Sequence, residues 1–132
     1  MFIRAVAKRE MNTLIPKLIG KTIIISITDP KEAEYHNMFR KPILKLKFHD
    51  MHYLPVEDRF ILFNKEMAQQ IVKFIKKYQD ADHLVVHCSA GLSRSPAVAA
   101  AISEYLHIPH TFFETHLPNT MVFSILRTTF GF

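Results

Sequence analysis

The chain is most constrained by an apolar strand that leads through a short polar loop into an alanine-rich helix. Residues 84–86 are Leu-Val-Val and predict a buried strand, and residues 97–102 are Ala-Val-Ala-Ala-Ala-Ile and predict a buried helix. Ser95 is a suitable N-cap for that helix, and Pro96 suits its first position because proline lacks the N–H that would stay unpaired there. A strand that leads directly into a packed helix indicates an α/β fold.

The rest of the chain repeats this alternation. β-branched residues fill 22–28, and alternating apolar residues mark 42–48 as a half-exposed strand. The spacing of apolar residues becomes helical after Asn64, a suitable cap. The pattern predicts a central, mainly parallel sheet flanked by helices. The strands are expected at 2–7, 22–28, 42–48 and 83–88, and the helices at 12–18, 31–40, 64–78, 95–102, 111–115 and 119–127.

With 132 residues and 48% hydrophobic content, the chain has the size and composition of one domain spanning 1–132. No apolar stretch is long enough for a transmembrane helix, and the N-terminus is too short for a signal-peptide core. The one cysteine cannot form an internal disulfide, which suits a reducing compartment. We therefore expect a soluble cytoplasmic protein that does not bind membranes.

The net charge of +5 is spread over small groups of lysine and arginine. A field of this kind favours acidic partners, including phosphoproteins, by steering them. Stable nucleic-acid binding is not expected, because no basic stripe is interleaved with aromatic residues.

The loop between the strand and the alanine-rich helix has the residues of an anion site. Gly91 allows the loop to curl so that successive backbone N–H groups face inward. The helix N-terminus and the planar guanidinium of Arg94 add to this nest, which predicts a site for a phosphoryl group. The residues assigned to phosphate binding are Ser89, Ala90, Gly91, Leu92, Ser93 and Arg94.

The same electrostatic field acts on the thiol of Cys88. A helix N-terminus and a nearby cation favour the thiolate, so Cys88 is expected to act as a nucleophile. Ser95 can donate its hydroxyl hydrogen toward the sulfur and stabilise it when it leaves. His87, which precedes the cysteine, is expected to order the loop through hydrogen bonds rather than to act as a base.

These residues resemble the signature His-Cys-x-x-Gly-x-x-Arg-Ser/Thr of the cysteine-based protein tyrosine phosphatases. Residues 88–95, Cys-Ser-Ala-Gly-Leu-Ser-Arg-Ser, are similar to the form common in the dual-specificity branch, and a looser similarity to small bacterial and viral phosphatases extends over about 22–127. The resemblance implies the phosphatase fold and a two-step hydrolysis through a phosphocysteine. It also implies that Cys88, Arg94, Ser95 and an aspartic acid carry the reaction without a metal or another cofactor.

In that family an aspartate on a separate loop, roughly thirty to forty residues before the cysteine, protonates the leaving oxygen. Asp50 follows the 42–48 strand and lies 38 residues before Cys88, whereas Asp58 lies 30 residues before it. We take Asp50 as the general acid and Asp58 as the alternative. His49 and His52 flank Asp50, but no further ligands are spaced to complete a metal site.

The loop also bears on the substrate. Lipid-directed phosphatases usually carry extra lysines in this loop, and residues 89–93 contain none. The expected substrate is a phosphorylated protein, with phosphotyrosine, and in a shallow pocket also phosphoserine and phosphothreonine, as the group that is hydrolysed. Two alternatives on the same fold stay open: a non-catalytic module that binds phosphate groups, and an RNA 5′-triphosphatase.

Overall fold

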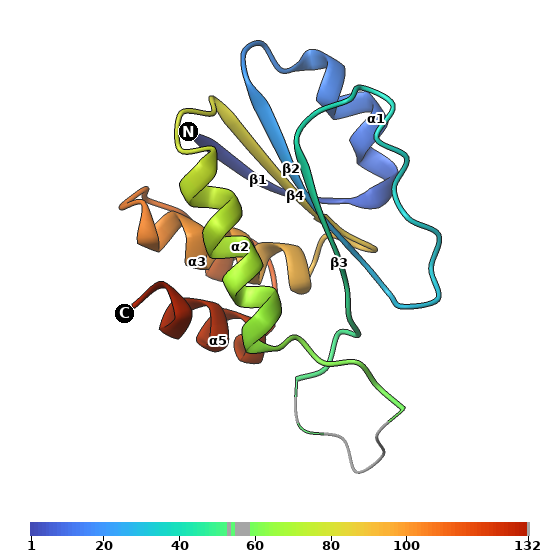
Figure 1. The fold of residues 1–132 in the computed structure, drawn as a ribbon, viewed down its shortest axis with the longest axis vertical. Coiled ribbons are helices and arrows are strands. Elements are labelled where there is room, and N and C mark those ends of the chain that lie inside the picture. The colour runs from blue at the N-terminus through green and yellow to red at the C-terminus, as the bar shows by residue number, and fades with distance from the viewer. Residues whose placement is uncertain (53, 55–58, 132) are drawn as a thin grey trace.

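The computed structural model describes residues 1–52, 54 and 59–131, and its centre is a four-stranded sheet (Figure 1). The strands are β1 (Phe2–Ala7), β2 (Thr22–Thr28), β3 (Ile43–Lys47) and β4 (His83–Cys88), in the order β1-β4-β2-β3 across the sheet. Every neighbouring pair is parallel. The prediction of an α/β fold with a parallel sheet flanked by helices is therefore confirmed.

β2 and β4 occupy the two central positions of the sheet. Every residue of β2 is buried, as are five of the six residues of β4. Parallel strands covered on both faces have nearly continuous apolar sequences, which is the form of Thr-Ile-Ile-Ile-Ser-Ile-Thr in β2 and His-Leu-Val-Val-His-Cys in β4. As a consequence, Cys88 lies at the carboxyl end of a central strand.

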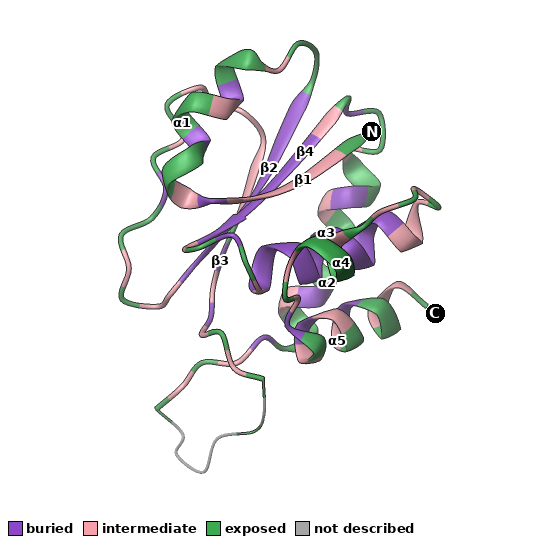
Figure 2. Ribbon diagram, turned by 180° about the vertical axis from the view of Figure 1, so that it is seen from behind, coloured by how far each residue is buried: buried purple, intermediate pink, exposed green. Residues whose placement is uncertain are grey.

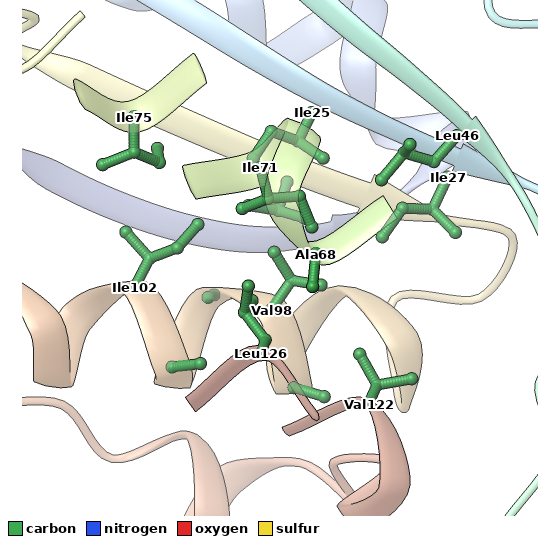
Figure 3. Packing of buried hydrophobic residues seen from close by; sticks show 14 of the residues in the cluster. Ile25, Ile27, Leu46, Ala68, Ile71, Ile75, Val98, Ile102, Val122 and Leu126 are labelled. Atoms are coloured by element: carbon green, nitrogen blue, oxygen red, sulfur yellow. The ribbon is translucent and has the colours of Figure 1, made fainter. Parts of the chain in front are cut away.

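Two long helices, α2 (Lys65–Lys77) and α3 (Arg94–Tyr105), cover one face of the sheet, and a third, α5 (Thr120–Phe130), packs against both of them. Ile71 of α2 lies toward the strand residue Ile25, and Leu126 of α5 lies beside Val98 of α3 in the same apolar core (Figure 3). α3 is buried along most of its length (Figure 2), and its alanines allow it to approach the sheet closely. Tight packing of α3 fixes the position of the loop that precedes it.

A shorter segment covers the opposite face. It consists of the 3₁₀ turn η1 (Lys8–Glu10), the helix α1 (Met11–Leu14) and the turn η2 (Ile15–Lys17), and its residues Met11 and Ile15 share a core with Ile24 and Val85. The remaining helix, α4 (Phe112–Thr115), precedes α5. Within the described part of the chain, no helix has the length and apolar character needed to cross a membrane.

The predicted start of α3 is wrong. The helix begins at Arg94, with Ser93 in the cap position, and the carbonyl of Ser93 accepts a hydrogen bond from the N–H of Ala97. Ser95 therefore lies inside the helix. Its hydroxyl contacts the sulfur of Cys88 rather than capping the helix.

The predicted helix at 31–40 is also wrong, because this segment forms turns and coil. Glu32 accepts a hydrogen bond from the backbone N–H of Asp29, and Asn37 accepts one from the N–H of Lys41. Side chains that bond to nearby backbone groups in this way compete with helical hydrogen bonds.

Candidate active site

Cys88 and Arg94 lie at the two ends of one loop at the carboxyl edge of the sheet. Cys88 is the last residue of β4, and Arg94 is the first residue of α3. Both side chains are almost fully buried, with 2% of Cys88 and 5% of Arg94 exposed. The predicted strand, loop and helix are thus present, and they bring the thiol and the guanidinium to the same edge.

The sulfur of Cys88 has two hydrogen-bonding partners. The backbone N–H of Gly91 donates to Sγ over 3.2 Å, and the hydroxyl oxygen of Ser95 lies 3.2 Å from the same sulfur. Both contacts stabilise a negative charge on the sulfur, because a backbone N–H and a hydroxyl can each donate to it. Ser95 was assigned to this contact from its position in the sequence.

Gly91 allows the loop to pass against the end of strand β1. Its φ is +74°, and a Cβ at this position would lie 2.5 Å from the backbone N of Ala7 and 2.6 Å from the carbonyl carbon of Val6. Glycine is therefore required both for the backbone conformation and for the close approach. Beside it, the N–H of Lys8 donates to the carbonyl of Ser89 over 3.4 Å. The loop thus rests on β1.

Several loop N–H groups have no acceptor. In the described residues, those of Ser89, Ala90 and Leu92 make no hydrogen bond. On the other side of the loop, the carbonyls of Leu92 and Ser93 accept hydrogen bonds from the N–H groups of Leu117 and Asn119, each over 3.0 Å. The loop is therefore held through its carbonyls, which leaves N–H donors for a ligand.

Three groups hold the guanidinium of Arg94. Nη1 donates to Oδ1 of Asp29 over 2.7 Å and to the carbonyl of Phe48 over 2.8 Å, and Nη2 donates to the hydroxyl of Ser89 over 3.1 Å. Nε is buried and has no hydrogen-bonding partner in the part of the chain that the structure describes. The protein thus fixes one side of the guanidinium and leaves the Nε–H donor unpaired.

Glu32 links the loop residue Ser89 to Asp29 and Lys8. Its Oε1 accepts hydrogen bonds from the Ser89 hydroxyl, over 2.8 Å, and from the N–H of Asp29, while Oε2 lies 3.2 Å from Nζ of Lys8. Burial raises the pKa of the Glu32 carboxyl, but the donors from Asp29, Ser89 and Lys8 outweigh it and bring the pKa below its ordinary value. Glu32 is therefore a carboxylate at neutral pH.

Asp50 is held against the loop by its Oδ1 atom. This oxygen accepts hydrogen bonds from the Ser93 hydroxyl, over 2.9 Å, and from Nδ2 of Asn119, over 2.8 Å. His52 lies beside it, with Nε2 at 3.5 Å from the same oxygen. Within the described residues, the hydrogen bonds and the ion pair of the Asp50 carboxylate all involve Oδ1, so Oδ2 is open to a bound molecule. The alternative acid, Asp58, lies outside the described residues.

His87 lies in β4, directly before Cys88. Its Nε2 is 2.7 Å from the Ser26 hydroxyl, and the ring packs edge-on against Tyr35 at a centroid distance of 5.4 Å. Burial lowers the pKa of His87 from 6.5 to about 4, so the ring is neutral at neutral pH. A neutral, fully buried imidazole between two strands can order the loop, but it has no access to a substrate.

The sequence interpretation did not include Asp29, Glu32 and Lys8 among the site residues. Asp29 directly follows β2, and a residue after a central parallel strand lies at the edge where ligands bind. The position of Asp29 after this strand was the signal in the sequence that could have identified it as a site residue. The contacts of Glu32 and Lys8 join segments far apart in the sequence and have no local signature.

No cluster of three or more His, Cys, Asp or Glu side chains within the described residues has the arrangement of a metal site. His49 therefore belongs to no such cluster. Its Nδ1 accepts a hydrogen bond from the N–H of Ile61. This contact closes the base of the loop that follows Asp50.

No protein-family model and no curated protein sequence matches the chain. Solved structures do match it. Human tyrosine phosphatase-like serine/threonine/tyrosine-interacting protein superposes with a TM-score of 0.59 and 20% identity, over 94% of this chain and 84% of that one. PTPMT1 in complex with PI(5)P gives a TM-score of 0.60 and 17% identity, over 98% of this chain and 90% of that one.

A third structure, Tk-PTP in the active form, matches with a TM-score of 0.52 and 17% identity, over 98% of this chain and 80% of that one. At such identities the likeness concerns the fold. It covers nearly the whole chain in all three cases, and each of these proteins bears a tyrosine phosphatase or phosphatase-like name or abbreviation. The chain therefore has the tyrosine phosphatase-like fold that its cysteine loop implied.

Proposed function

We propose that this protein hydrolyses phosphate monoesters on proteins through a phosphocysteine formed on Cys88. One observation carries the proposal: a thiol with two hydrogen-bonding partners lies in the same loop as an arginine whose buried Nε–H has no partner among the described residues. An unpaired buried donor costs about 1–3 kcal/mol, which a bound phosphate oxygen would recover. The N–H groups of Ser89, Ala90 and Leu92, which make no hydrogen bond within the described part of the chain, supply further donors to the same anion.

In the first step the Cys88 thiolate attacks phosphorus. The bond from phosphorus to the ester oxygen breaks, its electron pair stays on that oxygen, and the oxygen takes the proton from Oδ2 of Asp50. Arg94 and the loop N–H groups hold the three equatorial oxygens. The tether of Oδ1 to Ser93 and Asn119 keeps the acid close to the loop.

In the second step a water molecule attacks phosphorus and gives a proton to the Asp50 carboxylate. The phosphorus–sulfur bond breaks, and its electron pair returns to Cys88. The hydroxyl of Ser95, 3.2 Å from the sulfur, stabilises the departing thiolate. The products are inorganic phosphate and the enzyme in its starting protonation state.

Phosphotyrosine is the preferred substrate in this proposal, with phosphoserine and phosphothreonine as further substrates. The loop presents Leu92, which is 55% exposed, rather than a lysine that would bind the additional phosphates of an inositol headgroup. Tk-PTP bears a phosphatase abbreviation and was solved in an active form, whereas PTPMT1 was solved with PI(5)P. A lipid substrate is therefore the alternative that the experiment has to exclude.

The test is to incubate the protein with an aryl phosphate, phosphopeptides of the three kinds, vesicles that contain PI(5)P, and an RNA with a 5′-triphosphate. Phosphate release from the phosphotyrosine peptide and a phosphate adduct on Cys88 after acid quenching are expected. Cys88→Ser should bind the peptide without turnover. Binding by the wild type without phosphate release, or a faster reaction with lipid or RNA, would overturn the proposal.

A further inference from the structure

A groove of about 920 Å³ runs along the outer side of strand β1, away from Cys88. The turns and helix that follow β1 form one wall, with Arg9, Leu14 and Lys17, and the segment around α4 forms the other, with Ile108 and Phe112. Figure 2 shows β1 at the edge of the sheet, between α1 and α4. The mechanism proposed above uses none of these residues.

The floor of the groove is a row of backbone groups. The N–H of Phe2 donates to the carbonyl of Asp82, so Phe2 and every second residue after it bond to β4. In a parallel pair the intervening residues, Ile3 and Ala5, turn both N–H and C=O outward. These outward groups have no partner within the described residues. They can pair with one more strand.

The last outward N–H of this row, that of Ala7, is already bonded to the carboxylate of Glu10. The outward N–H of Ala7 donates to Oε1 of Glu10 over 2.9 Å. A strand added to β1 would therefore pair with Ile3 and Ala5 and stop before Ala7. The open stretch is short, so the groove fits a segment of a few residues rather than a long strand.

The two walls differ in chemistry. On the α1 side the lining contains the cations Arg4, Arg9 and Lys17, and Glu10, the one carboxylate among the lining residues, is bonded to backbone. On the α4 side Ile3 and Ala5 point into the apolar core together with Phe112. Because side chains of a strand alternate between faces, a bound strand would present every second residue to each wall.

We propose that this groove binds an extended segment of a partner protein in which acidic residues alternate with apolar ones, by addition of a strand to β1. Acidic side chains would face Arg4, Arg9 and Lys17, and apolar side chains would face Ile108 and Phe112. Main-chain hydrogen bonds to Ile3 and Ala5 supply affinity, and the alternation supplies specificity. A second copy of this chain is disfavoured as occupant, because its β1 edge carries the same cations.

The probe for this proposal is a labelled ten-residue peptide of alternating glutamate and valine. It should bind the wild-type protein, and the affinity should fall as salt is added. A peptide of alternating lysine and valine, and one with the glutamates and valines in separate blocks, should not bind. Of two N-methylated forms of the probe, methylated either on the valines or on the glutamates, one should lose binding and the other should keep it.

Arg9→Glu with Lys17→Glu should weaken binding by at least roughly tenfold, since both exposed charges are reversed. Lys73→Glu with Lys76→Glu makes the same charge change on exposed positions of α2 and should leave binding unchanged. Amide exchange at Ile3 and Ala5 should slow in the complex. Equal binding of both N-methylated forms, equal effects of the two double variants, or self-association of the protein through β1 would overturn the proposal.

Discussion

Nη1 of Arg94 donates a 2.7 Å hydrogen bond to Oδ1 of Asp29, a residue 65 positions earlier in the chain. The guanidinium is almost buried, whereas 48% of the Asp29 side chain is exposed. The end of strand β2 therefore sets the orientation of an arginine that belongs to the loop after β4. An arginine can bind a phosphate through two parallel hydrogen bonds only if its plane is correctly oriented.

Removal of the Asp29 carboxylate should reduce turnover without removing any group that contacts the substrate. In Asp29→Ala, Arg94 keeps the Phe48 carbonyl and loses its charged partner, and kcat/KM for an aryl phosphate should fall by roughly 10- to 100-fold. Asp29→Asn retains an acceptor oxygen and should recover part of this loss. Inhibition by inorganic phosphate should weaken in parallel.

Glu34→Ala provides the matched control for Asp29→Ala. Glu34 pairs with Lys45 over 3.0 Å on the surface, and its loss removes one carboxylate without touching Arg94. Its kinetics should equal those of the wild type. An Asp29→Ala protein with unchanged kcat/KM would show that Asp29 does not position Arg94.

Asp50→Asn should slow the reaction according to the leaving group. The amide keeps an acceptor oxygen for Ser93 and Asn119 but carries no proton for the departing oxygen. Hydrolysis of phenyl phosphate should fall by about 10²- to 10⁴-fold, and hydrolysis of a nitrophenyl ester, whose phenolate leaves without a proton, should fall far less. The measurement is kcat across a series of aryl phosphates. If Asp58→Asn shows this dependence and Asp50→Asn does not, the acid is Asp58.

Gly91→Ala should destabilise the protein more than the same change at another glycine in the left-handed region. Both Gly91 and Gly131 have positive φ, but a Cβ at Gly91 meets the backbone of Val6 and Ala7, whereas a Cβ at Gly131 has nothing within 4 Å. Gly131→Ala should cost about 1–2 kcal/mol from the backbone alone. Urea unfolding of both variants checks this, and equal losses would contradict a close approach at Gly91.

The buried His87 should make stability depend on pH. The unfolded ring takes up a proton near pH 6.5, and the folded ring only near pH 4, so the unfolded state binds more protons between these values. The free energy of unfolding should therefore be highest above pH 6.5 and fall as the pH is lowered, by roughly 3 kcal/mol at the end of the window. Urea unfolding from about pH 7.5 to about pH 4.5 measures the slope.

His87→Asn should flatten that slope, and His36→Asn, at an exposed coil position, should not. An NMR titration of the His87 ring in the folded protein gives an independent reading. A ring that titrates at its ordinary value, or a slope that survives His87→Asn, would contradict the assignment.

The parts of the structure that were predictable are those with a local signature. The buried runs of β2 and β4 and the Asn64 cap of α2 follow from residues that interact with their neighbours in sequence, and all three are present. The loop from Cys88 to Arg94 was recognised for the same reason. The parallel sheet covered by helices was predictable from the alternation of strand and helix patterns along the sequence.

Other features depend on contacts that no local pattern records. The strand order β1-β4-β2-β3 decides that Gly91 meets β1 and that Asp29 meets Arg94. The start of α3 was misplaced because Ser93 and Ser95 are equally good caps by type. Tertiary contacts separate them, since Ser95 bonds to the sulfur of Cys88 and Ser93 bonds to Asp50.

The contact of Gly91 with Val6 and Ala7 joins the loop after β4 to β1, an edge strand whose one neighbouring strand in the described sheet is β4. Edge strands are among the first elements to detach in local unfolding, and detachment of β1 would remove the wall on which the loop rests. Strand and loop are thus one cooperative unit. Any ligand that pairs with β1 raises the free energy of this opening by mass action and so stabilises a loop that it never touches.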